Sequence, residues 1–188
     1  MLTSGHRYQQ ISLKNFGQGG TMTTGNPKDY VTPEVKANIG KEGPAFTLPE
    51  LLDRSTLRRF AQATQDRNPL YSDEEAARKS RYGGLIVPPA HLAPGAGPAG
   101  PRELAIRSGA MPQVEIPGMS RAVFGGNEIE YFRPVYLGDA LTSRTRITYI
   151  QQRQGRSGPM VITAYETVYT NQRNDLVAIS HQTRIRLP

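Results

Sequence analysis

The chain contains no cysteine and only three histidines among its 188 residues. Without cysteine there can be no disulfide bonds or thiolate metal sites, which fits a reducing compartment, so we expect a cytoplasmic protein. His6, His91 and His181 are too scattered to indicate a zinc site, and neither a metal nor another cofactor is expected. No apolar run approaches the roughly 20 residues that a membrane helix needs, and the polar start lacks the apolar core of a secretory signal. No membrane partner is therefore expected.

Negative charge is also in short supply, because 23 lysines and arginines outnumber 16 aspartates and glutamates and leave a formal net charge of +7. The positive residues are spread thinly, some beside one predicted helix and others within strand-like segments. This spacing is typical of solvated surfaces, so no nucleic-acid partner is expected. Binding to DNA or RNA would rest on charge alone and would weaken steeply with salt. The same charges suit the attraction of an anionic, nucleotide-bearing thioester.

A chain of this length can bury one good core, which predicts a single domain. Residues 1–21 are polar and rich in glycine, with few large apolar side chains that could order them. We therefore expect residues 1–29 to be disordered or an extension, and a single domain to span residues 30–188.

The first half of this domain predicts two helices with a break between them. From Ser55 to Thr64 the apolar residues recur at helical spacing, and Ser55 is the expected N-cap. Pro69 and the short polar side chains before it end this helix. Ser72 then opens a second helix, with Glu75 at the capping-box position and basic residues in its last turn.

The second half predicts a sheet. Residues 94–118 are rich in proline and glycine and are expected to form a long loop around a short helix at 102–107. Four long segments rich in Val, Ile, Thr and Tyr follow, with turn residues between them. They are Arg121–Phe132, Ala140–Gln152, Met160–Thr170 and Leu176–Leu187. In meander or near-meander order they form one curved antiparallel sheet that the upstream helices cover, so the predicted class is α+β.

Two residue clusters together resemble the MaoC-like hydratase/dehydratase family. Phe60 to Asp73 reads Phe-Ala-Gln-Ala-Thr-Gln-Asp-Arg-Asn-Pro-Leu-Tyr-Ser-Asp, which is similar to that family's Gly-Asp-x-Asn-Pro-x-His signature. Phe132 to Asp139 reads Phe-Arg-Pro-Val-Tyr-Leu-Gly-Asp, which is similar to the family's Phe-x-x-Pro-Val-x-x-Gly-Asp strand and turn. Within the family, the chain looks most like the fungal fatty-acid-synthase-type dehydratase subgroup and related bacterial two-component hydratases.

The resemblance implies a hot-dog fold, in which a curved antiparallel sheet wraps a central helix and two such units pair through their sheets. In active members an aspartate and a histidine hydrate a trans-2-enoyl thioester or dehydrate the (R)-3-hydroxyacyl form. The substrate would be carried by coenzyme A or acyl carrier protein. Backbone N–H groups at a helix start would face the thioester oxygen, and here that helix is expected at Ile86 to Ala93, after Gly83 and Gly84.

The sequence departs from the family signature at both ends of the motif. Gln65 replaces the glycine before Asp66, and Tyr71 occupies the histidine position. A tyrosine with an ordinary pKa near 10 is a poor base at neutral pH, so the pair of Asp66 and Tyr71 is expected to be a degenerate, inactive dyad. The tyrosine form is typical of family halves that complete a pseudo-dimer beside a catalytic half.

Each candidate residue also has a structural interpretation. Asn68 and Pro69 are good turn formers, Gly83 and Gly84 suit a tight turn, and Tyr82 can be a core aromatic, but all are candidate substrate contacts in the family. His91 is a candidate displaced base or a packing group near a helix start. On the strand expected at the dimer seam, Glu128, Glu130 and Arg133 would form an exposed face.

Three functions remain open on the sequence alone. The first is a subunit of a heteromeric (R)-specific enoyl-CoA hydratase or 3-hydroxyacyl thioester dehydratase, which shapes the acyl tunnel while a second hot-dog protein supplies the Asp/His pair. The second is a self-sufficient homodimeric hydratase that uses Asp66 with Tyr71 or His91. The third is an acyl-thioester binding module without turnover.

Overall fold

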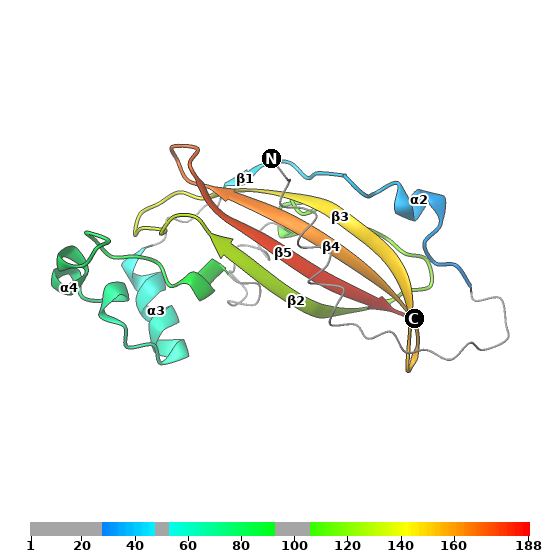
Figure 1. Cartoon of the computed structure of the whole chain (residues 1–188), viewed down its shortest axis with the longest axis horizontal. Helices are drawn as coiled ribbons and strands as arrows, with labels where there is room; N and C mark the ends of the chain where they lie inside the picture. The colour runs from blue at the N-terminus through cyan, green and yellow to red at the C-terminus, as the bar shows by residue number, and fades with distance from the viewer. Residues whose placement is uncertain (1–27, 48–52, 93–105) are drawn as a thin grey trace.

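The computed structural model describes residues 28–47, 53–92 and 106–188 (Figure 1). The expected extension, residues 1–29, lies almost wholly outside the described residues. The expected short helix at 102–107 also lies mostly outside them. The single domain at 30–188 remains a prediction.

A five-stranded, wholly antiparallel sheet dominates the described structure. Its strands are β1 (Phe46–Thr47), β2 (Arg121–Tyr131), β3 (Thr142–Gly155), β4 (Gly158–Thr170) and β5 (Leu176–Leu187). They lie in the order β1-β3-β4-β5-β2, and the sheet is strongly curved (Figure 1). The four predicted strands are confirmed. The expected order holds only for β3, β4 and β5, because the chain crosses from β2 to the far side of the meander before β3 begins.

Short turns join the long strands where the sequence places its turn residues. Gly155 and Gly158 pair at the β3–β4 turn, and Gly158 has a φ of 123°, which a side chain would oppose. The β4–β5 turn contains Asn174 at a φ of 60°, in the left-handed region that asparagine tolerates best among residues with a side chain. These two turns fix the register of the β3–β4–β5 meander.

The helices are short and lie at the ends of the sheet. They are α2 (Pro33–Lys36), α3 (Arg54–Thr64), the 3-10 helix η1 (Pro69–Tyr71), α4 (Glu74–Lys79) and the 3-10 helix η2 (Pro89–Leu92). Figure 1 shows α3, η1 and α4 together at one end of the sheet and α2 toward the other. The two expected helices are confirmed, but their caps differ from the prediction. The helix α3 begins at Arg54, and Asp73 rather than Ser72 caps α4 by accepting from Glu75 N at 2.9 Å.

Two apolar clusters form the core. The first joins α2 and the segment after residue 109 to β3 and β4, and contains Val35, Ala110, Met111, Val114, Ile116, Met119, Ile147, Ile150, Val161 and Tyr165. The second joins α3 to the strand ends beside it, and contains Leu57, Val87, Leu92, Val135, Leu141, Tyr169, Val177 and Ala178. Leu57 and Leu92 are each 1% exposed, so α3 and η2 are anchored on the sheet through these leucines.

The helix expected at Ile86 to Ala93 is not formed in the part that the structure describes. Ile86 instead makes a β-bridge with Tyr136, and Pro89–Leu92 is a single 3-10 turn. Pro88 and Pro89 explain the difference, because neither can donate a helical hydrogen bond and each restricts the residue before it. Among the described helices, none is long and apolar enough to cross a membrane.

Candidate active site

The first motif begins where α3 ends. Gln65 has a φ of 55°, in the left-handed region. Gln65 N–H donates to Gln62 O at 3.2 Å and Asp66 N–H donates to Ala61 O at 2.9 Å, a pair of bonds that together form a Schellman motif. Glycine adopts this conformation without a steric cost, which explains the glycine of the family signature. Gln65 adopts the same conformation at a cost, because it has a side chain.

Asp66 and Asn68 shape the turn that follows. Asp66 Oδ1 accepts from Asn68 N at 3.0 Å, and Asn68 Oδ1 accepts from Leu70 N at 3.1 Å. Asn68 thereby caps η1, and Pro69 occupies the first position of that helix, where its missing N–H is not needed. The side chains of Asp66 and Asn68 thus hold the backbone that carries Tyr71, and Asp66 is exposed to solvent.

Tyr71 lies partly buried at the end of η1, close enough to three other candidates to be influenced by them. Burial and the negative charge of Asp66 raise the pKa of Tyr71, and the neighbouring Tyr82 raises it further. A hydrogen bond from the Asn68 side chain acts in the opposite direction and is outweighed. At neutral pH the Tyr71 phenol is therefore protonated. It can donate a hydrogen bond but cannot accept a proton from water as the family's histidine does.

The turn after α4 brings Tyr82, Gly83 and Gly84 to the same region. The Arg81 guanidinium lies 4.8 Å from the Tyr82 ring centroid and also donates to the Tyr82 hydroxyl at 2.6 Å. Gly83 has a φ of 71°, and a Cβ at either glycine would meet nothing within 4 Å. There is thus open space beside both glycines, although Gly83 N–H already donates to Ser80 O at 3.2 Å.

Backbone hydrogen bonds join the first motif to the second. Ile86 N–H donates to Leu70 O at 3.2 Å, which ties the η1 turn to the apolar run after the two glycines. Val87 N–H donates to Val135 O at 2.8 Å, beside the bridge between Ile86 and Tyr136. The N–H groups of Ile86 and Val87 are therefore occupied, and neither is available to a thioester oxygen.

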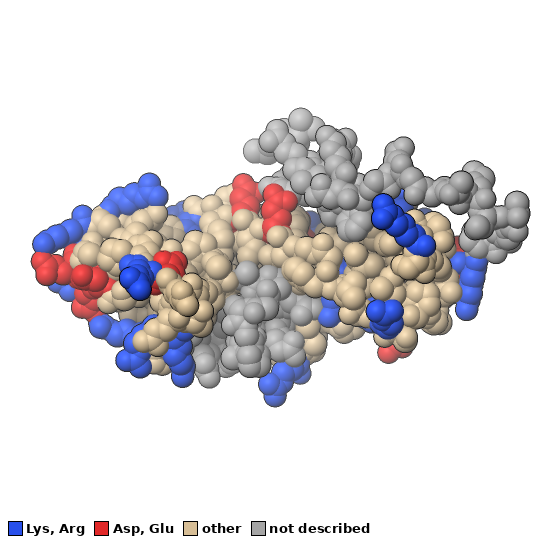
Figure 2. Space-filling model, turned by 90° about the horizontal axis from the view of Figure 1, so that it is seen from below, with Lys and Arg blue, Asp and Glu red and all other residues tan. Residues whose placement is uncertain are grey.

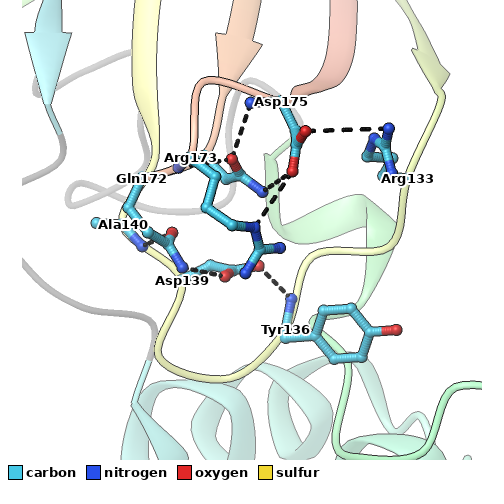
Figure 3. Close-up of polar contacts among 8 residues, drawn as sticks. Arg133, Tyr136, Asp139, Ala140, Gln172, Arg173 and Asp175 are labelled. Atoms are coloured by element: carbon cyan, nitrogen blue, oxygen red, sulfur yellow. Dashed lines mark hydrogen bonds and ion pairs between the residues drawn. The ribbon is translucent and has the colours of Figure 1, made fainter.

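Asp139, the last residue of the second motif, holds this pairing in place. Asp139 is 6% exposed, and its carboxylate accepts from Tyr136 N at 2.8 Å and from Gln172 Nε2 at 3.0 Å. Gln172 Oε1 in turn accepts from Ala140 N at 3.1 Å, so the β2–β3 and β4–β5 connections are fastened together (Figure 3). The role of Asp139 is to fix the turn that presents residues 135–137 to the first motif.

Figure 3 shows a second set of polar contacts, centred on Asp175, beside those of Asp139. Asp175 Oδ2 accepts from Asn171 Nδ2 at 3.2 Å and from Arg173 Nε at 3.3 Å, and Arg133 lies 4.0 Å away. The Asn171 hydrogen bond, followed by the Arg173 hydrogen bond and charge, lowers the pKa of Asp175. These contacts order the β4–β5 turn.

His91 lies on η2. Its ring meets the Phe60 ring edge to face with centroids 5.0 Å apart, and its Nδ1 is buried without a hydrogen-bond partner among the described residues. Burial lowers the pKa of His91, and no described carboxylate acts on it. The structure thus brings Asp66, Asn68, Tyr71 and Tyr82 together, but it pairs His91 with an aromatic ring rather than with Asp66.

Two positioning contacts were not apparent from the sequence. The Tyr131 hydroxyl donates to Pro89 O, which ties β2 to η2, and burial raises the pKa of that phenol. The sequence indicated a turn at Asp139, but it did not indicate that Asp139 is buried and hydrogen-bonded there. Only the tertiary contact with Gln172 shows what the carboxylate does.

Comparisons with known proteins agree with the arrangement. Residues 39–180 match the family model described as "FAS1-like, dehydratase domain region". A UPF0336 protein from Thermobifida fusca is 37% identical over 120 residues, which are 60% of this chain and 72% of that protein.

Solved structures show the fold. The ChsH1-ChsH2 complex from Mycobacterium tuberculosis matches with a TM-score of 0.63 at 19% identity, over 82% of this chain and 87% of that chain. The (R)-hydratase from A. caviae involved in PHA biosynthesis matches with a TM-score of 0.56 at 19% identity, over 80% and 96%. The curled antiparallel sheet with few helices is the hot-dog fold of these neighbours, which confirms the predicted fold class.

Proposed function

This chain belongs to the family of FAS1-like dehydratase domain regions, and from that premise we propose that it is the supporting subunit of a heteromeric hydro-lyase. In this proposal the chain shapes the acyl tunnel and binds a thioester of coenzyme A or acyl carrier protein. A second hot-dog chain supplies the Asp/His pair. The reaction is hydration of a trans-2-enoyl thioester to the (R)-3-hydroxyacyl form, or its reverse.

The state of Tyr71 is the single observation that carries the proposal. Hydration requires one group to deprotonate water as it attacks C3 while a proton reaches C2. A histidine near pH 7 exchanges protons in both directions, whereas the raised pKa of Tyr71 keeps its phenol protonated. The Tyr71 position therefore lacks a base, and in this proposal the base belongs to a different chain.

The surroundings of Tyr71 favour a binding role for the same region. One carboxylate oxygen of Asp66 and the amide oxygen of Asn68 accept backbone N–H groups of the turn, as in capping residues. The protonated Tyr71 phenol and the open space beside Gly83 and Gly84 are suited to contact a thioester without reacting with it.

A heteromeric assembly is further supported by one of the structural neighbours, whose name describes a complex of two proteins, ChsH1 and ChsH2. The self-sufficient alternative has less support, because His91 has a pKa lowered by burial and no described carboxylate beside it. An acyl-thioester binding module without turnover is the third possibility, and the assay below separates all three.

The test is the hydration of a panel of trans-2-enoyl-CoA thioesters by the purified chain, alone and mixed with each Asp/His-containing hot-dog protein encoded beside it. The proposal expects silence alone and turnover in one mixture. Activity of the chain alone would establish the self-sufficient enzyme. Thioester binding without turnover in any mixture would establish a binding module.

Two substitutions locate the chemistry within the active mixture. Asp66→Asn and Tyr71→Phe in this chain are expected to change kcat by less than about threefold, because neither residue transfers a proton. In a self-sufficient enzyme Asp66→Asn would lower kcat by about a hundredfold or more. Ser72→Ala, an exposed neighbour in the same turn, is the matched control.

A further inference from the structure

The edge strand β2 carries two glutamates whose placement bears on which partner it can accept. Among the described residues β2 is the last strand of the sheet, and it pairs only with β5. Phe132 N–H donates to Val177 O at 2.9 Å, so by antiparallel alternation Asn127, Ile129 and Tyr131 direct their N–H and C=O groups toward the open edge. These backbone groups are available to another strand.

The usable length of this edge is bounded at both ends. A register shift between Phe124 and Gly126 breaks the regular ladder at one end, and at the other end β2 stops at Tyr131 and Arg133 N–H turns back to Val177 O at 3.3 Å. Only residues 126–131 can therefore pair regularly with another strand. The middle of that stretch falls at Glu128 and Ile129.

Glu128 lies at this midpoint and Glu130 two residues further on, so both side chains are on the same face of the sheet. Both are exposed, and the residues opposite them on β5 are His181 and Ile179, neither of which is a lysine or arginine. Burial lowers the pKa of His181 despite its acidic neighbours, so it is not a fixed positive charge beside Glu128 at neutral pH. Figure 2, seen from the side on which β2 lies, shows a small acidic group near the middle of the molecule, apart from the acidic residues around α4.

Symmetric pairing of two copies through this edge brings these carboxylates together. If the two-fold axis passes at Ile129, Glu128 of each copy lies directly opposite Glu130 of the other. If it passes at Glu128, the two Glu128 side chains face each other. Directly opposite side chains have Cβ atoms about 5 Å apart, and like charges at that spacing are destabilising. The two registers that use the edge most fully both create this repulsion.

We propose that Glu128 and Glu130 select against self-pairing of β2 and favour a different chain whose edge strand presents lysine or arginine opposite them. This proposal rests on the proposed function only in taking the partner to be a second hot-dog chain. It does not require that the complex be enzymatically active. Since the chain as a whole carries a net charge of +7, this acidic edge is a local feature and not a reflection of overall composition.

A charge-reversed copy of the chain serves as the probe. Glu128→Lys/Glu130→Lys is purified, and sedimentation velocity at low salt is measured for the wild type, the variant and a 1:1 mixture. The mixture is expected to dimerise with a dissociation constant about tenfold or more below that of either protein alone, and the difference is expected to shrink in 1 M salt. Glu34→Lys/Glu75→Lys, with the same net charge but with changes on α2 and α4, is the control and should show no such preference.

A second variant keeps the test decisive if charge reversal perturbs the fold. Glu128→Gln/Glu130→Gln removes the repulsion without adding charge, and it is expected to self-associate about tenfold more tightly than the wild type. Wild-type dimers as tight as the mixed pair, or a Gln variant no more associated than the wild type, would overturn the proposal. The sedimentation experiment uses no thioester. If the mixtures in the hydration assay were inactive, the proposed function would therefore fail, whereas the pairing preference measured here would not be affected.

Discussion

Replacing Gln65 by glycine is expected to stabilise the protein, because Gln65 has a φ of 55° at the end of α3. The two hydrogen bonds that close this helix end use only backbone atoms, so the substitution leaves them intact. Gln65 is exposed, and its side chain contributes nothing to either core cluster. The change therefore isolates the conformational preference of one residue.

The magnitude follows from two opposing terms. A left-handed conformation costs a residue with a side chain about 1 to 2 kcal/mol, and this cost is relieved by glycine. The greater freedom of glycine in the unfolded chain offsets about 0.5 to 1 kcal/mol of the relief. The net expectation is a gain of about 0.5 to 1 kcal/mol in the free energy of unfolding, or roughly 1 to 4 °C in Tm for a protein of this size.

Thermal unfolding followed by circular dichroism measures this shift. Gln65→Ala is the matched control, since alanine retains a Cβ in the same conformation and should give no gain. Ala63→Gly, inside α3, should lower stability by about 1 kcal/mol. If Gln65→Gly lowered Tm as much as Ala63→Gly does, Gln65 would not be in a left-handed conformation that glycine relieves.

Three further outcomes test other parts of the structure. Leu57→Ala should cost about 2 to 5 kcal/mol in chemical unfolding, because Leu57 is 1% exposed in the second core cluster, whereas exposed Arg58→Ala should stay within about 0.5 kcal/mol. Asp139→Ala should cost about 1 to 3 kcal/mol by leaving two donors unpaired, and a neutral result would contradict its fastening role. Since the folded pKa of His91 lies below 6.5, the unfolded chain protonates first, and stability falls as pH drops below about 6.5. His91→Gln should reduce that fall, measured as Tm against pH, while an unchanged pH profile would show that the burial of His91 is not responsible.

Much of the candidate site could be predicted because its signals are local. The turn chemistry of Asp66, Asn68 and Pro69 depends on hydrogen bonds between neighbours in the chain, and the structure forms them as the sequence indicates. The tyrosine at position 71 is equally plain in the sequence. What the sequence could not supply is the state of its phenol, since burial and the approach of Asp66 and Tyr82 depend on how the turn folds back.

The predictions that failed involve choices between similar local signals. Ser72 and Asp73 are both good caps, and only the backbone path decides that Asp73 accepts the bonds of α4. The helix expected after Gly84 is replaced by a β-bridge between Ile86 and Tyr136 and by a 3-10 turn. Pro88 and Pro89 disfavour the helix, because neither can donate a backbone hydrogen bond. Tyr136 lies 50 residues further along the chain, so a local sequence pattern cannot predict that it pairs with Ile86.

The sequence by itself determined the long strands, the turns between them and the degenerate motif, because β-branched alternation and turn residues act over a few positions. Only the tertiary structure decided that β2 lies outside β5 and ends the described sheet, since strand order depends on which distant edges meet. That same long-range choice leaves Glu128 and Glu130 on an open edge, and it places His91 against Phe60 instead of a carboxylate.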